Sequence, residues 1–492
     1  MSESASISSS IAKGAAVNAV GLVTRAIGTP LLYILLTRLF GSAPLGLFLI
    51  AYNLMEIMGA LSTSGFVDGG ILYASRFAHR DEDRERLYGT LRSIFLLTIG
   101  VGFFLLGFIL LLAPWLVSRF YPQHPGLVPV LQILAFTLPF ESLSRVAVSI
   151  PKAHLKMGPE VLVFNIMAPI MTMALALAFW LLDWGAPGIS MAFVLTYVGT
   201  LGLAVWQLKK FMDVKPLFRF SGRKEKLGEL LGFVIPQNLN MALNRFISSM
   251  DVIMLAGFGA SPGQIAFYGL GAQIVRNVRQ VKIVFSNSYN PVIARYFHER
   301  RLGELNATLG TVSAWSIALG MPALFVVAFY RHDLLLLFDP AFVDDPTFML
   351  LLLVNPFLSC SVGMAGNALV MAGLSRWNLF NSVLVGGLNF GFNWLMIPRY
   401  GLFGAALATA MAGTIVSALQ VIEVNRLIRV RLPWRYILPW ILLGLALFAW
   451  PFFTPFVQAS LWLKLVTGAA MLGIYSLIYF KGSSRVRRLF GT

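Results

Sequence analysis

Three cationic side chains stand three residues apart in a stretch hydrophobic enough to cross a bilayer, 267–292. They are Arg276, Arg279 and Lys282, and at helical spacing they share one face. An arginine at bilayer depth costs roughly 2.5–3.5 kcal/mol, so intramembrane cations usually line a cavity or a substrate path. The stripe therefore predicts a binding site for an anion. The structural alternative is that Lys282 reaches the cytoplasmic interface while one arginine pairs with a nearby carboxylate.

Amide and phenol side chains extend this polar surface. Gln273, Asn277 and Gln280 recur at helical spacing beside the cations, and Tyr52 and Asn53 lie in an earlier apolar segment. Such groups suit sugar hydroxyls, which we expect them to contact. Hydrogen bonding between helices explains the same amides equally well.

Positive charges dominate the interior of the apolar segments. Arg25, Arg245, Arg276 and Arg279 are expected in the central layer together with Glu56, and Asp251 is expected farther out. Arginine keeps its charge and binds phosphate oxygens through two parallel hydrogen bonds. This balance of charge favours a diphosphate as the anion.

Several carboxylates are candidates for gating or for coupling to an ion. Glu141 and Arg145 stand four residues apart, which predicts an ion pair within one helix. Asp68 is expected either to gate the inner mouth against a cation or to cap irregular backbone in a glycine-rich stretch. Glu56 and Asp251 are the candidates to bind Na⁺ or a proton if transport is coupled to an ion.

The composition is that of a polytopic membrane protein. Hydrophobic residues make up 58% of the chain and charged residues 12%, and the mean hydropathy is +0.77. We therefore expect an all-α fold of fourteen membrane-spanning helices. The predicted segments are 11–37, 45–71, 92–117, 127–149, 158–181, 187–208, 229–257, 264–293, 309–329, 347–371, 378–397, 402–425, 436–453 and 460–480.

The net charge of +17 is a topology signal rather than a nucleic-acid footprint. Most lysines and arginines lie in the N-terminal stretch and in the loops after even-numbered segments. The opposite loops carry only Arg38, Arg119, Arg331 and Arg399. This positive-inside pattern predicts that both termini lie in the cytoplasm. Cys360 is the lone cysteine, so disulfides are excluded, and the sequence shows no metal-ligand cluster or cofactor motif.

Two related halves are predicted from words that recur at a nearly constant offset. Residues 40–44 (FGSAP) match 258–262 (FGASP), and 184–188 (WGAPG) match 400–404 (YGLFG). A parallel duplication of six helices places a substrate cavity between the repeats. The predicted domains are an N-terminal lobe 1–208, a basic cytoplasmic linker 209–228, a C-terminal lobe 229–427, and helices thirteen and fourteen with the tail, 428–492.

The last two helices have no counterpart in the repeat. They either form a groove for lipid tails beside the second lobe or are an addition without a role in transport. Lys464, near the outer end of the final helix, is expected to reach toward the interface.

The run 389–409 carries a family resemblance. Its pattern N-x-x-x-N-x-x-L-I-P-x-x-G-x-x-G-A-A-x-A-T resembles that of polysaccharide exporters in the multidrug/oligosaccharidyl-lipid/polysaccharide exporter (MOP) superfamily. The residues also have a local role: Pro398 is expected to end a helix, Gly401 and Gly404 to permit a tight external turn, and the following alanines to allow close helix packing.

The resemblance implies a flippase of a bacterial cytoplasmic (inner) membrane. It would move a polyprenyl-diphosphate-linked oligosaccharide from the cytoplasmic to the outer leaflet by alternating access. Its partners would be membrane lipids and a glycan polymerase, and Na⁺ or H⁺ would be the counter-ion if transport is coupled to an ion. Relatives that flip lipid-linked peptidoglycan precursor carry an Arg-Asp pair near the end of the first helix. This chain has Arg38-Leu39 there, which favours O-antigen, capsule or exopolysaccharide synthesis.

Other interpretations fit the sequence less well. A multidrug extruder of the same superfamily would take cations and need carboxylates where this chain has arginines. A flippase for peptidoglycan precursor remains an alternative within the family. A major-facilitator carrier should show glycines around the Asp-Arg of segment 80–86, which lacks them. A glycan polymerase or ligase needs catalytic residues in a large external loop, and 330–346 shows only His332 with scattered aspartates. We expect no enzyme activity.

Overall fold

The computed structural model describes residues 2–77, 84–154, 156–218, 227–342, 344–430, 434, 437–443, 446 and 461–489. Within these residues the chain is helical and contains no strand. The chain divides into two compact units, Met1–Gly269 and Leu270–Thr492. The predicted segment 436–453 lies largely outside the described residues. Residues 219–226 of the predicted linker lie wholly outside them.

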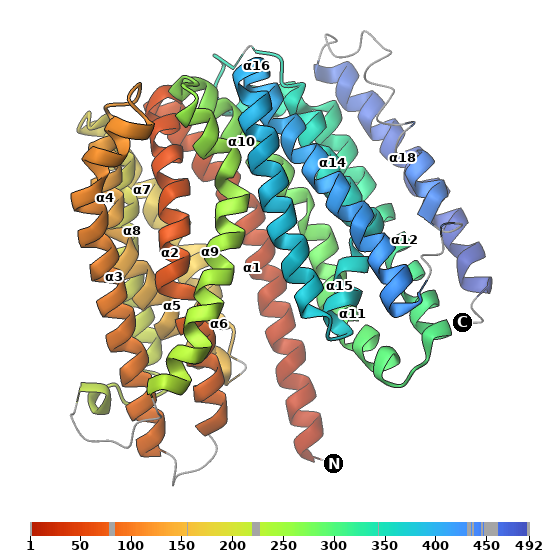
Figure 1. The fold of residues 1–492 in the computed structure, drawn as a ribbon, viewed down its shortest axis with the longest axis horizontal. Coiled ribbons are helices and arrows are strands. Elements are labelled where there is room, and N and C mark those ends of the chain that lie inside the picture. Colours follow the sequence, from red (N-terminus) through yellow and green to blue (C-terminus); the bar gives the residue numbers. More distant parts are fainter. Residues whose placement is uncertain are drawn as a thin grey trace. The chain divides into compact units, whose positions relative to one another are not determined.

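The first unit is built from long apolar helices that run alongside one another (Figure 1). Its elements are α1 (Ser2–Phe40), α2 (Ser42–Phe77), α3 (Arg84–Phe120), α4 (Leu127–Ala135), α5 (Thr137–Ala153), α6 (Gly158–Glu160), the π-helix η2 (Val161–Met167), α7 (Ala168–Leu181), α8 (Gly185–Leu208), the short 3₁₀ helix η3 (Lys215–Phe218), α9 (Leu227–Gly257) and the N-terminal part of α10 (Pro262–Val278), up to Gly269.

Helices α2 and α9 approach closely within the first unit. The backbone N–H of Gly65 donates to Asn238 Oδ1 at 2.6 Å, and a Cβ at Gly65 would lie 2.4 Å from the Val234 carbonyl oxygen. Only glycine permits this approach. Helix α9 is the first helix of the predicted second lobe, but it packs against α2 and belongs to the first compact unit. The lobe boundaries 1–208 and 229–427 stay a prediction.

The second unit begins at Leu270, within α10. Its further elements are α11 (Gln280–His298), α12 (Leu302–Phe329), α13 (Arg331–Phe338), α14 (Phe348–Val362), α15 (Met364–Met371), α16 (Ser375–Glu423), the π-helix η4 (Val424–Ile428) and α18 (Leu461–Leu489). A buried apolar core joins α11, α12, α15 and η4 through side chains such as Ile293, Leu305, Leu369 and Ile428.

Helix α16 is a hairpin of two helical arms. The chain reverses at Gly401, whose φ of 56° and ψ of −129° are strained for any residue with a side chain. Asn389 Nδ2 donates to Thr409 Oγ1 at 2.7 Å and ties the arms together. The predicted tight turn is present. Pro398, however, lies inside the helix rather than at its end, and the reversal comes at Gly401.

Eight helices are long and apolar enough to cross a membrane among the described residues, or nine if the bent pair α14–α15 counts as one span. One of them, Arg376–Ile428, contains both arms of the α16 hairpin, which correspond to two predicted segments. The total of fourteen spans stays a prediction.

The prediction for Lys464 is wrong. Its side chain is buried, and Nζ lies 2.9 Å from Asp333 Oδ2 of α13. The hydroxyl of Tyr330 donates to the Lys464 carbonyl at 2.8 Å, and the hydroxyl of Tyr475 donates to the Ala318 carbonyl of α12 at 2.6 Å. A lysine buried in this way needs its paired carboxylate. Helix α18 is thus joined to the second unit by specific polar contacts.

Candidate anion-binding site

The predicted span 264–293 is interrupted at its cationic stripe. Helix α10 ends at Val278, α11 begins at Gln280, and Arg279 lies between them. The N–H of Arg279 donates to the Arg276 carbonyl at 3.2 Å, a bond across three residues instead of four. The stripe therefore lies where the helix changes its winding.

No carboxylate among the described residues neutralises the two arginines of the stripe. Arg276 is half-buried and donates from Nη2 to Gln273 Oε1, an uncharged acceptor, at 2.8 Å. Arg279 is exposed. Neither forms an ion pair with any described residue, so the alternative in which one pairs with a carboxylate does not hold there. Two guanidinium groups are left available for an anionic ligand.

Lys282 is held inside the second unit rather than at an interface. Its Nζ donates to Asn367 Oδ1 of α15 at 3.0 Å, and Asn367 Nδ2 donates to Asn290 Oδ1 of α11 at 3.0 Å. Helix α15 follows α14 after a bend of 54° beside Gly363, which brings Asn367 to the lysine. Asn290 and Asn367 were not predicted as site residues. The signal that could have indicated them is an amide within an apolar segment, close to a break in the helix.

The remaining predicted sugar contacts divide between the units. In the second unit, Asn277 is half-buried and Gln280 is exposed. In the first unit, Asn53 Nδ2 donates to the Leu49 carbonyl of its own helix at 2.7 Å, and Tyr52 stacks on Phe48 with ring centroids 5.6 Å apart. Helix and packing contacts therefore already account for Tyr52 and for the donor of Asn53.

The predicted charges of α1, α9 and α2 are partly paired. Arg25 is exposed on α1 and forms no ion pair among the described residues. Arg245 Nη1 lies 3.4 Å from Glu56 Oε2, which joins α9 to α2. Asp251 accepts a hydrogen bond of 2.8 Å from the hydroxyl of the fully buried Tyr268. Both carboxylates expected to bind an ion already have partners.

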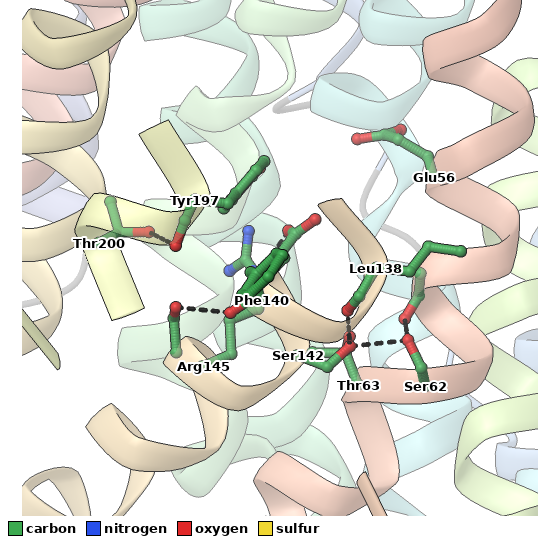
Figure 2. A network of polar contacts seen from close by, with 12 residues as sticks. Glu56, Ser62, Thr63, Leu138, Phe140, Ser142, Arg145, Tyr197 and Thr200 are labelled. Carbon is green, nitrogen blue, oxygen red and sulfur yellow. Dashed lines mark hydrogen bonds and ion pairs between the residues drawn. The ribbon is translucent and has the colours of Figure 1, made fainter. Parts of the chain in front are cut away.

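The expected ion pair within α5 is present. Arg145 Nε donates to Glu141 Oε1 at 2.8 Å, and the Arg145 guanidinium also lies 4.7 Å from the centre of the Phe164 ring. In the same region Ser142 Oγ lies 2.7 Å from Ser62 Oγ and 2.9 Å from Thr63 Oγ1, as Figure 2 shows. These bonds join α5 to α2, whereas Arg145 is held by Glu141 and by the Phe164 ring.

Among the described residues, Asp68 is bonded to an amide and forms no ion pair with a cation. Its Oδ2 accepts a hydrogen bond from Gln237 Nε2 of α9 at 2.8 Å. Helix α2 is continuous through the neighbouring glycines, so there is no irregular backbone to cap. Gly70 is needed for packing instead, because a Cβ there would lie 2.4 Å from Ser149 Oγ of α5.

A family model for polysaccharide biosynthesis proteins matches residues 35–338, more than half of the chain. The chain belongs to this family. A search of curated proteins finds no match.

Solved structures with the same fold are transporters and flippases. This polysaccharide biosynthesis protein is similar to the lipid II flippase MurJ in an inward closed conformation, with a TM-score of 0.68 and 14% identity over 95% of this chain and 99% of the other. It is similar to an inward-facing multidrug resistance MATE transporter of the MOP superfamily, with a TM-score of 0.68 and 14% identity over 83% and 98%.

A third structure concerns the polarity of the binding pocket. It is a MOP superfamily transporter from Pyrococcus furiosus, described as having a pocket of reverse polarity that suggests a different function. Its TM-score is 0.59 at 14% identity, over 85% of this chain and 95% of the other. Together these likenesses place this family member in the MOP fold, whose representatives here are transporters and not enzymes.

Proposed function

We propose that the chain is a flippase that moves a polyprenyl-diphosphate-linked oligosaccharide from the cytoplasmic to the outer leaflet of a bacterial inner membrane. It would act by alternating access in O-antigen, capsule or exopolysaccharide synthesis. The observation that carries this proposal is the stripe of Arg276, Arg279 and Lys282 at the α10–α11 break, whose arginines have no carboxylate partner among the described residues.

The chemistry of the stripe suits a diphosphate. Each guanidinium offers a planar pair of donors that matches two phosphate oxygens, whereas an ammonium acts as a point charge. Arg276 and Arg279 would hold the phosphates, and Lys282, fixed by Asn367, would add charge from inside the unit. Gln273, Asn277 and Gln280 lie along the same segment and are placed to contact the first sugars.

Two observations support the proposed class of saccharide: the family and the residues at the end of the first helix. The family model concerns polysaccharide biosynthesis, and one structure of the same fold is a lipid II flippase. The Arg38-Leu39 pair departs from the Arg-Asp expected of flippases for peptidoglycan precursor. This favours a lipid-linked polysaccharide unit, with a glycan polymerase as the expected partner for the flipped product.

A multidrug transporter is the second candidate, because the fold is also that of MATE proteins. An organic cation needs carboxylates that are free to meet it. In the first unit Glu56 faces Arg245, and Glu141 faces Arg145. Together with the unpaired arginines of α10–α11, this arrangement disfavours a cationic substrate.

The test is mass spectrometry of the lipid retained by the protein when it is extracted gently from its native membrane. The wild type is expected to retain a polyprenyl-diphosphate oligosaccharide, and Arg276→Ala/Arg279→Ala to retain at least about tenfold less, since hydrogen bonds to charged groups contribute about 1.5–3 kcal/mol each.

Arg119→Ala/Arg399→Ala is the matched control. It removes the same charge from two exposed arginines outside the stripe and should retain the lipid at the wild-type level. Retention of bulk phospholipids alone, or of an organic cation regardless of Arg276 and Arg279, would contradict the proposed substrate.

A further inference from the structure

The chain turns back against the first unit after helix α8. The helix is followed by a turn and then by the 3₁₀ helix η3. Leu217 of η3 is buried in the same apolar core as Leu91 of α3, and Met212 and Val214 pack against that core. The N–H of Leu217 donates to the Val214 carbonyl at 3.1 Å. The segment 209–218 therefore has a defined position on the first unit.

Other side chains of this region are exposed and are either basic or aromatic. The indole of Trp206 is 51% exposed and the ring of Phe211 is 40% exposed. The lysines at 209, 210 and 215 are exposed as well. We call these five residues, Trp206, Lys209, Lys210, Phe211 and Lys215, the basic–aromatic patch. Large aromatic rings of this kind are favoured where a membrane meets water, because one part of the surface is apolar and the other is wet.

One lysine of the patch is fixed on an aromatic ring. Lys210 Nζ lies 3.3 Å from the centre of the Trp206 ring, a cation–π contact between residues four apart at the end of α8. The contact holds the ammonium group beside the indole. Because an ammonium has three N–H donors and the ring face does not use them all, Lys210 can still donate to an anionic oxygen.

No carboxylate neutralises the three lysines among the residues that the structure describes. Asp213 is the one acidic residue between Trp206 and Phe218. Its Oδ1 accepts the backbone N–H of Lys215 at 3.0 Å, a bond that shapes the turn and does not involve an ammonium group. The patch thus carries three positive charges against one negative charge, and an anion would complete it.

The patch begins at the end of a helix that is long and apolar enough to cross a membrane, Gly185–Leu208. The predicted topology places this end on the cytoplasmic side, where anionic lipids give the leaflet a negative surface potential. At that depth an exposed indole lies at the level of the headgroups, and lysines reach their phosphates. A free anion would use the lysines but would gain nothing from Trp206 and Phe211.

We infer that the basic–aromatic patch binds the headgroup of an anionic phospholipid. The lysines would contact the phosphate, and Trp206 and Phe211 would contact the upper part of the acyl chains. A bound lipid would fix the end of α8 and η3 at the membrane surface. This inference concerns the first unit alone and does not depend on the proposed substrate, whose phosphates are assigned to Arg276 and Arg279 of the second unit.

The experiment is a native mass spectrometry titration of the purified full chain, in a non-ionic detergent, with dioleoylphosphatidylglycerol. Lys209→Gln/Lys210→Gln/Lys215→Gln should lower the affinity by about fivefold for each lysine, on the order of a hundredfold together. Dioleoylphosphatidylcholine, which has no net charge, should bind both proteins equally. The matched control is Lys156→Gln/Arg300→Gln/Arg426→Gln, which removes three exposed charges elsewhere and should keep the wild-type affinity.

Two single variants test the geometry of the patch. Asp213→Asn removes the negative charge but keeps an oxygen for the Lys215 N–H, so it should bind phosphatidylglycerol about fivefold more tightly than the wild type. Trp206→Leu keeps an apolar side chain but loses the cation–π contact, and should bind about two- to fivefold more weakly. Thermal unfolding in phosphatidylcholine should be the same for all variants, which checks their folding.

An unchanged affinity in the triple lysine variant would overturn the inference. So would specific displacement of the lipid by inorganic phosphate, compared with chloride at the same ionic strength, because the site would then bind a free anion. The triple lysine variant should show the same loss in the Arg276→Ala/Arg279→Ala background. If that background still retains its native polyprenyl lipid, the proposed substrate fails while the phospholipid site stands.

Discussion

Arg145 and Arg245 of the first unit differ from Arg276 and Arg279 of the second in what faces them. In the first unit Arg145 lies 2.8 Å from Glu141, and Arg245 lies 3.4 Å from Glu56. In the second unit Arg276 meets only the amide of Gln273, and Arg279 meets no carboxylate within the described residues. An arginine whose charge is already balanced gains little from an anionic ligand. The α10–α11 pair is therefore the stronger binding group.

Also at the residue scale, His124 makes folding sensitive to acid. It lies in the turn between α3 and α4 and is only 3% exposed. Burial lowers the pKa of its imidazole from the ordinary 6.5, opposed in part by backbone groups of Ala256 and Ala260. The unfolded chain therefore takes up a proton first as pH falls, so stability is full above about pH 6.5 and declines below it.

We expect His124→Gln to lose part of this acid sensitivity. The unfolding temperature of the wild type should fall from pH about 7.5 to about 5, and that of the variant should fall less, because glutamine does not titrate in this range. His298→Gln is the control, since His298 is exposed at the end of α11 and should leave the wild-type pH profile unchanged. Equal pH profiles for the wild type and His124→Gln would rule out this role.

At the scale of the element, irregular backbone occurs where polar groups gather. The winding changes at Arg279 between α10 and α11, α14 bends by 54° into α15, and α16 reverses at Gly401. The first two breaks bring Lys282 and Asn367 together, so that Lys282 donates a hydrogen bond to Asn367. The third lets Asn381 meet Glu423 at the far end of the hairpin.

The turn of the hairpin can be tested by Gly401→Ala. No heavy atom lies within 4 Å of the added Cβ, so any loss of stability arises from the backbone conformation alone. We expect about 1–3 kcal/mol of destabilisation, seen as a lower unfolding temperature of the purified protein. Gly391→Ala also has open space around its Cβ but lies in ordinary helix, and should be neutral or stabilising by about 0.5–1 kcal/mol. Equal unfolding temperatures for the two variants would show that the turn is unstrained.

At the scale of the whole molecule, the membrane potential offers a driving force for export. Moving one charge through 100 mV changes the free energy by roughly 2.3 kcal/mol, and a cell that is negative inside favours the exit of anions. A diphosphate with two charges would gain roughly twice this amount.

We therefore expect flipping to slow when the potential is clamped to zero while the ion gradients are held. The measurement is the appearance of the oligosaccharide on the far leaflet of vesicles with a potassium ionophore. Vesicles that contain the Arg276→Ala/Arg279→Ala protein give the background rate. A wild-type rate that does not change with the potential would mean that no net charge crosses during transport.

Several features follow from the sequence alone because they depend on local chemistry. The apolar segments require membrane-spanning helices, since backbone polar groups in lipid must be satisfied within the chain. Gly401 marks the hairpin turn because only glycine readily adopts its backbone angles. The spacing of Arg276, Arg279 and Lys282 places cations together on one segment, and the spacing of Glu141 and Arg145 predicts their ion pair.

The partners of these groups are decided only by the tertiary structure. Lys282 meets Asn367 across 85 residues, Asn381 meets Glu423 across 42, and Lys464 meets Asp333 across 131. The sequence indicates that each group is polar within or beside an apolar segment, but not which helix packs against it or whether water reaches it. Burial and pairing depend on how helices distant in the chain pack together. For that reason only the structure shows that Glu423 is buried and bonded to Asn381.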